Sequence, residues 1–288
     1  MAVEKKGMRV VKLFASDLDG TLLNALHKTD PVILASLRRL RAAGAHFSIA
    51  TGRTLRSNRA LGFEGNVAVV CANGSIVLDE EGRIARMVPL PAGFAAELAS
   101  AFPSAPLDFI TAEHTYHLCS EERHVASYGH MPVWRKVVMR GMSMTGGPEH
   151  IYDCEPAQIA ELEVCKVNAH IQGMGEASEV AAFIAEHDEV VNAPFDPSMF
   201  EVTRAGVNKG EAVAWLAGYL GIREDEVAVY GDGGNDIQML GRFAGYGHAY
   251  ATSNGSDEAK SAAGNVIGNC AGWAVPRHML RTLREQRD

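Results

Sequence analysis

Two carboxylates placed two residues apart, directly after a largely apolar run, constrain this chain more than any other feature. Asp17 and Asp19 belong to the pentapeptide Asp-Leu-Asp-Gly-Thr and follow the run Val10–Ala15. A charge at the end of a buried strand must be paired, metal-bound or catalytic, because burying it alone costs several kcal/mol. In parallel α/β sheets, ligands bind at the carboxyl ends of the strands. The pattern therefore predicts an active site at the end of this strand.

Composition limits the class of protein. The 288 residues are 47% hydrophobic and 22% charged, as in ordinary globular proteins. A formal net charge of −8 argues against non-specific binding to nucleic acid or to an anionic membrane. Five scattered cysteines without a CxxC pair indicate reduced thiols, and we find neither a secretory signal nor a run of about 20 apolar residues. We expect a cytoplasmic protein without nucleic-acid or membrane partners, whose oligomeric state the sequence does not indicate.

The pattern of expected strands and helices changes twice along the chain. Apolar strands alternate with amphipathic helices at both ends, for example in the strand at 45–50 and in the helix that Asp30-Pro31 begins. The middle, from about 87 to 198, mixes short strands and helices and predicts an α+β unit with an antiparallel sheet. The sequence therefore predicts an α/β domain with a second domain inserted into it.

Four polar signals fall at expected strand ends or helix starts in the two outer segments. Each alone has an ordinary explanation as a helix cap, a turn or a solvated lysine. Their positions and order favour one shared site. The signals are Asp17 with Asp19; Thr51-Gly52-Arg53 after the strand at 47–50; Lys209 before the helix at 210–220; and Asp232, Asn235 and Asp236 after the strand at 227–230.

This set of side chains suits phosphoryl transfer through an aspartyl phosphate. Asp17, Asp19 and either Asp232 or Asp236 supply the hard oxygen ligands that Mg²⁺ prefers. The cation offsets the repulsion between a carboxylate nucleophile and an anionic phosphate. A carboxyl two residues from the nucleophile is placed to protonate the leaving alcohol and then to deprotonate water. Phosphate oxygens would be held by Thr51, Lys209 and Asn235.

The motifs in this order resemble those of the haloacid dehalogenase (HAD) superfamily. They read Asp-x-Asp-Gly-Thr, Thr-Gly-Arg, Asn-Lys-Gly and Gly-Asp-x-x-Asn-Asp. The insertion after Cys71–Ser75 and the helix that starts at Lys209 resemble the Cof-type (subclass IIB) sugar-phosphatase branch. The resemblance spans nearly the whole chain.

The resemblance implies a Rossmann-like parallel-sheet core, 1–86 and 199–288, with an inserted α/β cap domain at 87–198 that selects the substrate. It implies that Asp17 is the nucleophile and Asp19 the general acid and base. Magnesium would bind Asp17, the Asp19 carbonyl and Asp232. The remaining residues would bind phosphate (Thr51, Gly52, Lys209, Asn235) or support the site (Arg53, Asp236).

We therefore expect a Mg²⁺-dependent phosphatase that acts on a small soluble phosphomonoester such as a sugar phosphate. Two alternatives stay open. A phosphomutase would use the same aspartyl phosphate but return the phosphoryl group to a sugar, and the large cap disfavours it only by family analogy. A catalytically silent sensor of phosphate ligands is disfavoured because every expected catalytic side chain is present.

A second group of polar residues lies in the middle segment. His114, His117, Cys119 and His124 are close enough in sequence to suggest a metal site. Their spacing lacks a helical or zinc-finger frame, so a hydrogen-bonded surface of the cap is the favoured interpretation.

Overall fold

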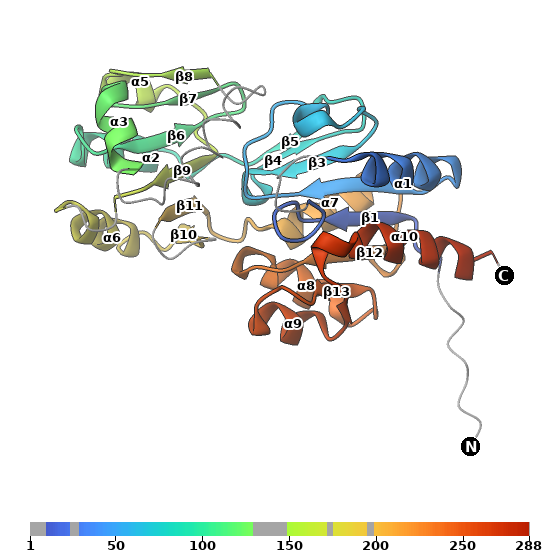
Figure 1. Cartoon of the computed structure of the whole chain (residues 1–288). Coiled ribbons are helices and arrows are strands. Elements are labelled where there is room, and N and C mark those ends of the chain that lie inside the picture. The colour runs from blue at the N-terminus through green and yellow to red at the C-terminus, as the bar shows by residue number, and fades with distance from the viewer. Residues whose placement is uncertain (1–9, 24–28, 129–148, 172–174, 195–198, 288) are drawn as a thin grey trace.

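The chain folds around two β-sheets. The computed structural model describes residues 10–23, 29–128, 149–171, 175–194 and 199–287. Within these described residues one sheet has eight strands and the other six, and the segment that forms the second sheet is inserted between strands of the first. Figure 1 shows the two sheets side by side, with the six-stranded sheet at the upper left.

The eight-stranded sheet is built from both ends of the chain. Its order is β14-β13-β12-β1-β2-β3-β4-β5, and β1 lies between β2 and β12. Neighbouring strands from β14 to β3 are parallel, whereas β4 and β5 are antiparallel additions. The strands are β1 (Leu13–Ser16), β2 (His46–Ala50), β3 (Ala68–Cys71), β4 (Ile76–Leu78), β5 (Ile84–Met87), β12 (Val227–Gly231), β13 (Ala249–Thr252) and β14 (Val266–Ile267).

Helices cover both faces of this sheet. Phe14 packs in a core cluster with side chains of α1 (Pro31–Ala42) and α10 (Ala274–Glu285). Its neighbours Leu13 and Ala15 pack in the opposite cluster, which includes side chains of α7 (Lys209–Tyr219), α8 (Ile237–Ala244) and α9 (Asp257–Ala263). A strand covered on both faces carries apolar side chains on both, as Leu13, Phe14 and Ala15 of β1 do, and the last residue of the strand, Ser16, is polar but also buried. The predicted α/β class with a parallel-sheet core is confirmed.

The six-stranded sheet has the order β10-β11-β9-β6-β7-β8 and is antiparallel except between β7 and β8. A core cluster on one of its faces includes side chains of α2, α5 and α6. The strands are β6 (Leu107–Ile110), β7 (His114–Tyr116), β8 (Glu149–Ile151), β9 (Lys166–Ala169), β10 (Val190–Asn192) and β11 (Phe200–Arg204). The helices among the described residues of this segment are α2 (Phe94–Ala101), α3 (Glu121–Ser127), α5 (Pro156–Ala160) and α6 (Ala177–Ala185).

Strand β11 differs from the expectation that the outer segment resumes at residue 199. It pairs with β9 and β10, with Glu201 opposite Asn168, so it belongs to the six-stranded sheet. Val202 is buried in the core cluster of that sheet. The chain therefore returns to the eight-stranded sheet only after Arg204. Apolar and polar residues alternate along β11, and that pattern alone fits either sheet.

The second face of the six-stranded sheet is polar. Lys166 and Asn168 alternate along β9 with Val167 and Ala169, which are buried in the core cluster. Lys166 Nζ donates to the carbonyl oxygen of Gly52, 3.1 Å away in the loop after β2. This polar face therefore contacts the loops at the end of the eight-stranded sheet.

His278 on α10 makes the stability of the core sensitive to pH. Its Nδ1 lies 2.9 Å from the Tyr230 hydroxyl, and burial lowers the pKa of His278 from 6.5 to about 4. A lowered pKa disfavours the folded state as the pH falls from the unfolded value towards the folded one. We expect His278 to cost the folded state up to about 2 kcal/mol at pH 5 and little at pH 7.5.

Urea unfolding at pH 7.5 and pH 5 measures this cost. The wild type should lose more stability than His278→Gln between these two values. Tyr230→Phe is the matched control, since it removes the hydroxyl and leaves His278 buried, and it should keep most of the pH dependence. Equal losses in the wild type and His278→Gln would contradict the prediction.

Candidate active site

The first carboxylate of the opening motif is buried beside a lysine. Asp17 follows β1, and its N–H donates to the Tyr230 carbonyl oxygen of β12 at 2.9 Å. Its Oδ1 accepts a hydrogen bond from Lys209 Nζ at 2.7 Å. Asp17 is 6% exposed and Lys209 is 1% exposed, so the pair lies almost entirely out of water. Residues 192 positions apart in sequence thus form one ion pair.

Lys209 also contacts the loop after β12. It is the first residue of α7, whose N-cap Asn208 accepts a hydrogen bond from the Glu211 N–H. Its Nζ lies 2.8 Å from Asp236 Oδ1 and 3.2 Å from Asn235 Oδ1. Burial opposes the charge of Lys209, but Asp17 and Asp236 outweigh burial and raise its pKa above the usual value. The ammonium is therefore charged at neutral pH.

The carboxylates of Asp232 and Asp236, both in the loop that follows β12, lie close to the carboxylate of Asp17. Asp236 Oδ2 accepts from the N–H groups of Asp232 and Gly233, each at 3.0 Å, which fixes the turn. Asp232 Oδ1 accepts a hydrogen bond from the Thr21 hydroxyl. Carboxylate oxygens of Asp17, Asp232 and Asp236 lie within 4.8 Å of one another. Three converging acidic groups are the main feature of the site.

The electrostatics of these carboxylates fit a divalent cation. Burial raises the pKa of Asp17 well above its usual value, Lys209 opposes the rise, and Asp236 and Asp232 add to it. Burial also raises the pKa of Asp232 to about 6. A bound cation would stabilise the ionised forms, and hard oxygen donors are the ligands that Mg²⁺ prefers. The donor set therefore fits Mg²⁺.

Asp19 is oriented differently from the other acids. Its carboxylate forms a two-pronged ion pair with Arg53, with Nε 2.7 Å from Oδ2 and a second bond from Nη2 to Oδ1. Both side chains are partly exposed, at 27% for Asp19 and 13% for Arg53. The acidic cluster thus contains Asp236, while the Asp19 side chain contacts Arg53. The expectation that the Asp19 carbonyl binds metal stays a prediction.

The loop after β2 approaches the site closely. Thr51 is buried, and its hydroxyl oxygen accepts from the Arg53 N–H at 3.1 Å. A Cβ on Gly52 would lie 2.8 Å from Asn73 Oδ1 and 3.1 Å from Asn235 Nδ2. Both atoms are the ends of side chains, so a side chain at position 52 would have to displace the amide groups of Asn73 and Asn235.

A glycine is required beneath Asp232. Gly20 has a φ of +81°, which side chains rarely adopt, and a Cβ there would lie 2.3 Å from Asp232 Oδ2. The Gly20 carbonyl oxygen accepts from Asn254 Nδ2 at 2.7 Å. The turn that carries Asp19 is thereby joined to the loop after β13.

Asn73 contributes to the site but was missed by sequence reasoning. It follows β3 with a φ of +56° and is 6% exposed. Its Oδ1 accepts from Asn235 Nδ2 at 3.3 Å, and its Nδ2 donates to Glu201 Oε2 at 3.4 Å. It therefore links the two sheets. The rule that identified Asp17 and Thr51, a polar residue after a buried strand, would have found Asn73 as well.

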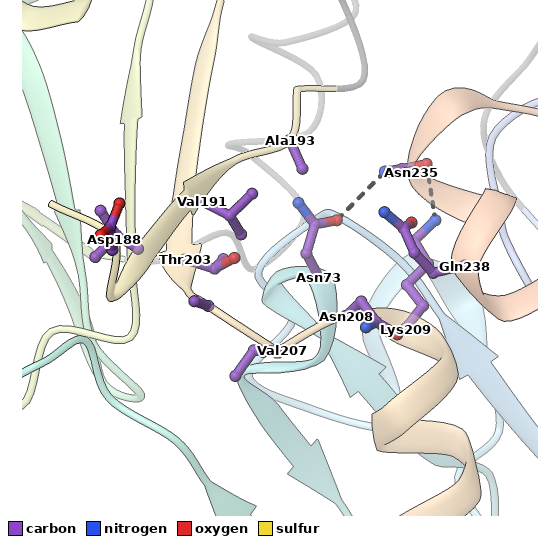
Figure 2. Close-up of a pocket in the computed structure, with 13 residues that line it drawn as sticks. Asn73, Asp188, Val191, Ala193, Thr203, Val207, Asn208, Lys209, Asn235 and Gln238 are labelled. Atoms are coloured by element: carbon purple, nitrogen blue, oxygen red, sulfur yellow. Dashed lines mark hydrogen bonds between the residues drawn. The ribbon is translucent and has the colours of Figure 1, made fainter. Parts of the chain in front are cut away.

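A cavity of about 360 Å³ lies beside the acidic cluster, between the two sheets. Figure 2 shows Asn73, Lys209 and Asn235 on one side of it, and Asp188, Val191 and Thr203 on the other. Its lining mixes amide, hydroxyl and charged groups with small apolar ones. Such a lining suits a small polar molecule.

These features define the class of protein. A profile described as haloacid dehalogenase-like hydrolase matches residues 14–275, so the chain belongs to this hydrolase family. The family resemblance expected from the motifs is therefore confirmed, and the chain is an enzyme of that family.

Two curated relatives are similar to this chain over most of its length. The chain is 27% identical over 284 residues to the HMP-PP phosphatase of Serratia proteamaculans, covering 95% of this chain and 96% of that protein. It is 26% identical over 270 residues to the 5-amino-6-(5-phospho-D-ribitylamino)uracil phosphatase YcsE of Bacillus subtilis, covering 91% and 92%.

Two solved structures share its fold. A haloacid dehalogenase-like hydrolase from B. subtilis superposes with a TM-score of 0.77 at 23% identity, covering 94% of this chain and 99% of the other. The HAD subclass IIB sugar phosphatase BT4131 superposes with a TM-score of 0.70 at 20% identity, covering 94% and 98%.

Among the helices that the structure describes, none has the length and apolar character needed to cross a membrane.

Removing the Lys209 charge should destabilise the fold. Lys209→Met leaves the carboxylates of Asp17 and Asp236 buried without their shared cation, which typically costs about 3–5 kcal/mol. Lys260→Met is the control, because Lys260 pairs at 3.5 Å with the exposed Asp257, and such pairs contribute about 0–1 kcal/mol. Urea unfolding at pH 7.5 compares the two variants. Equal effects would show that the buried lysine contributes no more than a surface one.

Proposed function

We propose that this protein is a Mg²⁺-dependent phosphatase that hydrolyses a small phosphomonoester, such as a sugar phosphate, through an aspartyl phosphate on Asp17. The observation that carries the proposal is the position of the Asp17 carboxylate. It is buried at the end of β1, held by Lys209 and adjacent to Asp232 and Asp236. A carboxylate fixed by a cation and surrounded by metal-ligating oxygens suits attack on phosphorus.

In the first half-reaction, a carboxylate oxygen of Asp17 attacks phosphorus and the bond from phosphorus to the substrate alcohol oxygen breaks. Protonated Asp19 gives its proton to that oxygen, so the leaving group departs as a neutral alcohol. In the structure both Asp19 oxygens accept from Arg53, which holds the ionised form, so this ion pair has to open before Asp19 carries the proton. Lys209 and Asn235 would contact the oxygens of the transferring phosphoryl group.

In the second half-reaction, water attacks the phosphorus of the aspartyl phosphate. Asp19, now ionised, accepts the proton of that water, and the bond between phosphorus and the Asp17 oxygen breaks. Inorganic phosphate leaves and both carboxyl groups return to their starting states. Asp17, Asp232 and the Asp19 carbonyl oxygen would hold Mg²⁺, which when bound supplies positive charge against the negative charge that accumulates between carboxylate and phosphate.

The cavity beside Lys209 would hold the alcohol part of the substrate. Its far wall comes from β10, β11 and their neighbouring loops, which belong to the six-stranded sheet. We propose that this inserted segment, at about 87–204, acts as a cap whose polar side chains select the alcohol. The two curated relatives are named for different phosphate substrates, so the physiological substrate of this chain requires a screen. A location in the cytoplasm remains part of this proposal.

Hydrolysis should depend on the metal. Purified protein with Mg²⁺ should release phosphate from an aryl phosphate and from sugar phosphates, and a chelator should stop the release reversibly. Asp232→Asn should raise the Mg²⁺ concentration needed for half-maximal activity, whereas exposed Asp257→Asn should not. Full activity in chelator would contradict the role of magnesium. Transfer to an added sugar phosphate in place of phosphate release would favour a phosphomutase, and no turnover of any phosphoester would favour a sensor.

Replacing Asp17 and replacing Asp19 should block different steps of the reaction. Asp17→Asn removes the nucleophile, so activity should vanish and no phosphoenzyme should form. Asp19→Asn removes the proton donor and base, which typically contribute about 10²–10⁴-fold. With an aryl phosphate, whose leaving group needs little protonation, Asp19→Asn should still form a phosphoenzyme and stall at its hydrolysis.

Intact-protein mass after acid quench measures this difference. The Asp19→Asn protein should gain the mass of one phosphoryl group, and peptide mapping should place that group on Asp17. A phosphoryl adduct on Asp17→Asn would overturn the assignment of the nucleophile.

A further inference from the structure

A buried cluster of histidines lies in the six-stranded sheet, outside the acidic site. Asp108 on β6, His117 directly after β7 and His124 on α3 come together there, with exposed fractions of 8%, 0% and 5%. The sheet register places Phe109 opposite Tyr116, which sets the preceding Asp108 beside His117. We expected a hydrogen-bonded surface of the cap at these histidines, but His117 and His124 are buried, so the expectation of a surface position was wrong. His114 and Cys119 lie outside this group of converging ligand atoms.

The ligand atoms of the three residues converge on one point. Asp108 Oδ1 lies 2.9 Å from His124 Nε2 and 3.4 Å from His117 Nδ1. All three atoms lie within 4.8 Å of one another. Ligands in a tetrahedral zinc site, at about 2.0–2.1 Å from the metal, are about 3.3 Å from each other. The two distances from the carboxylate oxygen bracket that value.

One nitrogen in this cluster lacks a hydrogen bond. Among the residues that the structure describes, His117 Nδ1 has no hydrogen-bond partner although its side chain is fully buried. A buried polar atom without a partner costs free energy, because it has lost its hydrogen bonds to water. Asp108 Oδ1 already lies 2.9 Å from His124 Nε2, so the atom that a metal ion would satisfy here is His117 Nδ1.

The outer nitrogens of both imidazoles are already engaged. His117 Nε2 lies 2.7 Å from His150 Nδ1, and His124 Nδ1 lies 3.3 Å from the Tyr152 hydroxyl. Metal-ligating histidines use their second nitrogen in this way, which fixes the ring and leaves the other lone pair for the metal. The inner nitrogens of both rings face the Asp108 carboxylate, and His124 Nε2 also lies 3.3 Å from the Tyr128 hydroxyl. A cation held between the inner nitrogens and the carboxylate would take the place of these contacts.

We propose that Asp108, His117 and His124 form a binding site for a transition-metal ion of the Zn²⁺ class. Two imidazole nitrogens and one carboxylate oxygen suit zinc, whereas Mg²⁺ prefers oxygen ligands only. The ion would join α3 to strands β6 and β7. The site stands apart from the proposed phosphatase reaction, because it shares no residue with the acidic cluster around Asp17.

Metal binding in solution tests the proposal without any activity measurement. Chelator-stripped full-length protein in saturating Mg²⁺ is titrated with Co²⁺, followed by visible absorption, and Zn²⁺ is then used as competitor. The wild type should bind one equivalent and show the strong visible bands of a four-coordinate site. Asp232→Asn, altered in the acidic cluster, should bind it equally well.

Variants of the cluster locate the ion. His124→Asn and Asp108→Asn should weaken binding by more than about 100-fold, and His150→Phe, which removes a partner of a ligand, by about 10- to 100-fold. His114→Asn is the matched control from the same sheet and should bind like the wild type. Zn²⁺ should raise the melting temperature of the wild type and of His114→Asn but not of His124→Asn.

Two outcomes would overturn the proposal. The first is a wild-type protein that takes up no Co²⁺ or Zn²⁺ once Mg²⁺ saturates the acidic cluster, which would show a hydrogen-bonded network only. The second is unchanged binding in cluster variants with loss in Asp232→Asn, which would place the ion at the acidic cluster. Far-UV circular dichroism of each variant establishes that it is folded, and the wild-type result decides the first outcome regardless of any variant.

Discussion

A buried ammonium between two carboxylates is the interaction on which the rest of the structure depends. Lys209 Nζ lies within 2.8 Å of oxygens from both Asp17 and Asp236, which come from opposite ends of the chain. Neither acid could be buried there in ionised form without a counter-charge. The pair is also what brings the start of α7, the end of β1 and the turn after β12 to one point. The pairing of β1 with β12 joins the two ends of the chain in one sheet, and the lysine joins the loops at the end of these strands.

Much of the site could be predicted because its residues obey a rule of topology. Parallel strands end at one edge of a sheet, so polar residues after buried strands converge there whatever their separation in sequence. Asp17, Thr51 and Asp232 follow this rule, and Lys209 does so as the first residue of a helix. Asn73 obeys it too and was missed, because its Asn-Gly sequence also fits an ordinary turn. The fold class was predictable for the same reason, from apolar strands alternating with amphipathic helices.

Other features depend on contacts that no local pattern specifies. The alternation along β11 does not say which sheet accepts the strand, and only its pairing with β9 and β10 decides this. The ion pair between Asp19 and Arg53 joins two motifs whose spacing gives no orientation. The histidine cluster needs Asp108, which lies in an apolar strand and carries no signal of its own until β6 is paired with β7. Each case is a tertiary pairing between segments that are ordinary when considered separately.

The period-two alternation along β9 has a consequence for how such an enzyme can change. Val167 and Ala169 pack in the interior of the inserted segment, while Lys166 and Asn168 point to the opposite face. Lys166 is fully buried, and its ammonium pairs with Glu201 and donates to the Gly52 carbonyl oxygen. Removing that ammonium would cost stability and would also break a contact between the two sheets. Lys166 and Glu201 are therefore expected to change together, and the polar face of the strand is constrained as strictly as the apolar one.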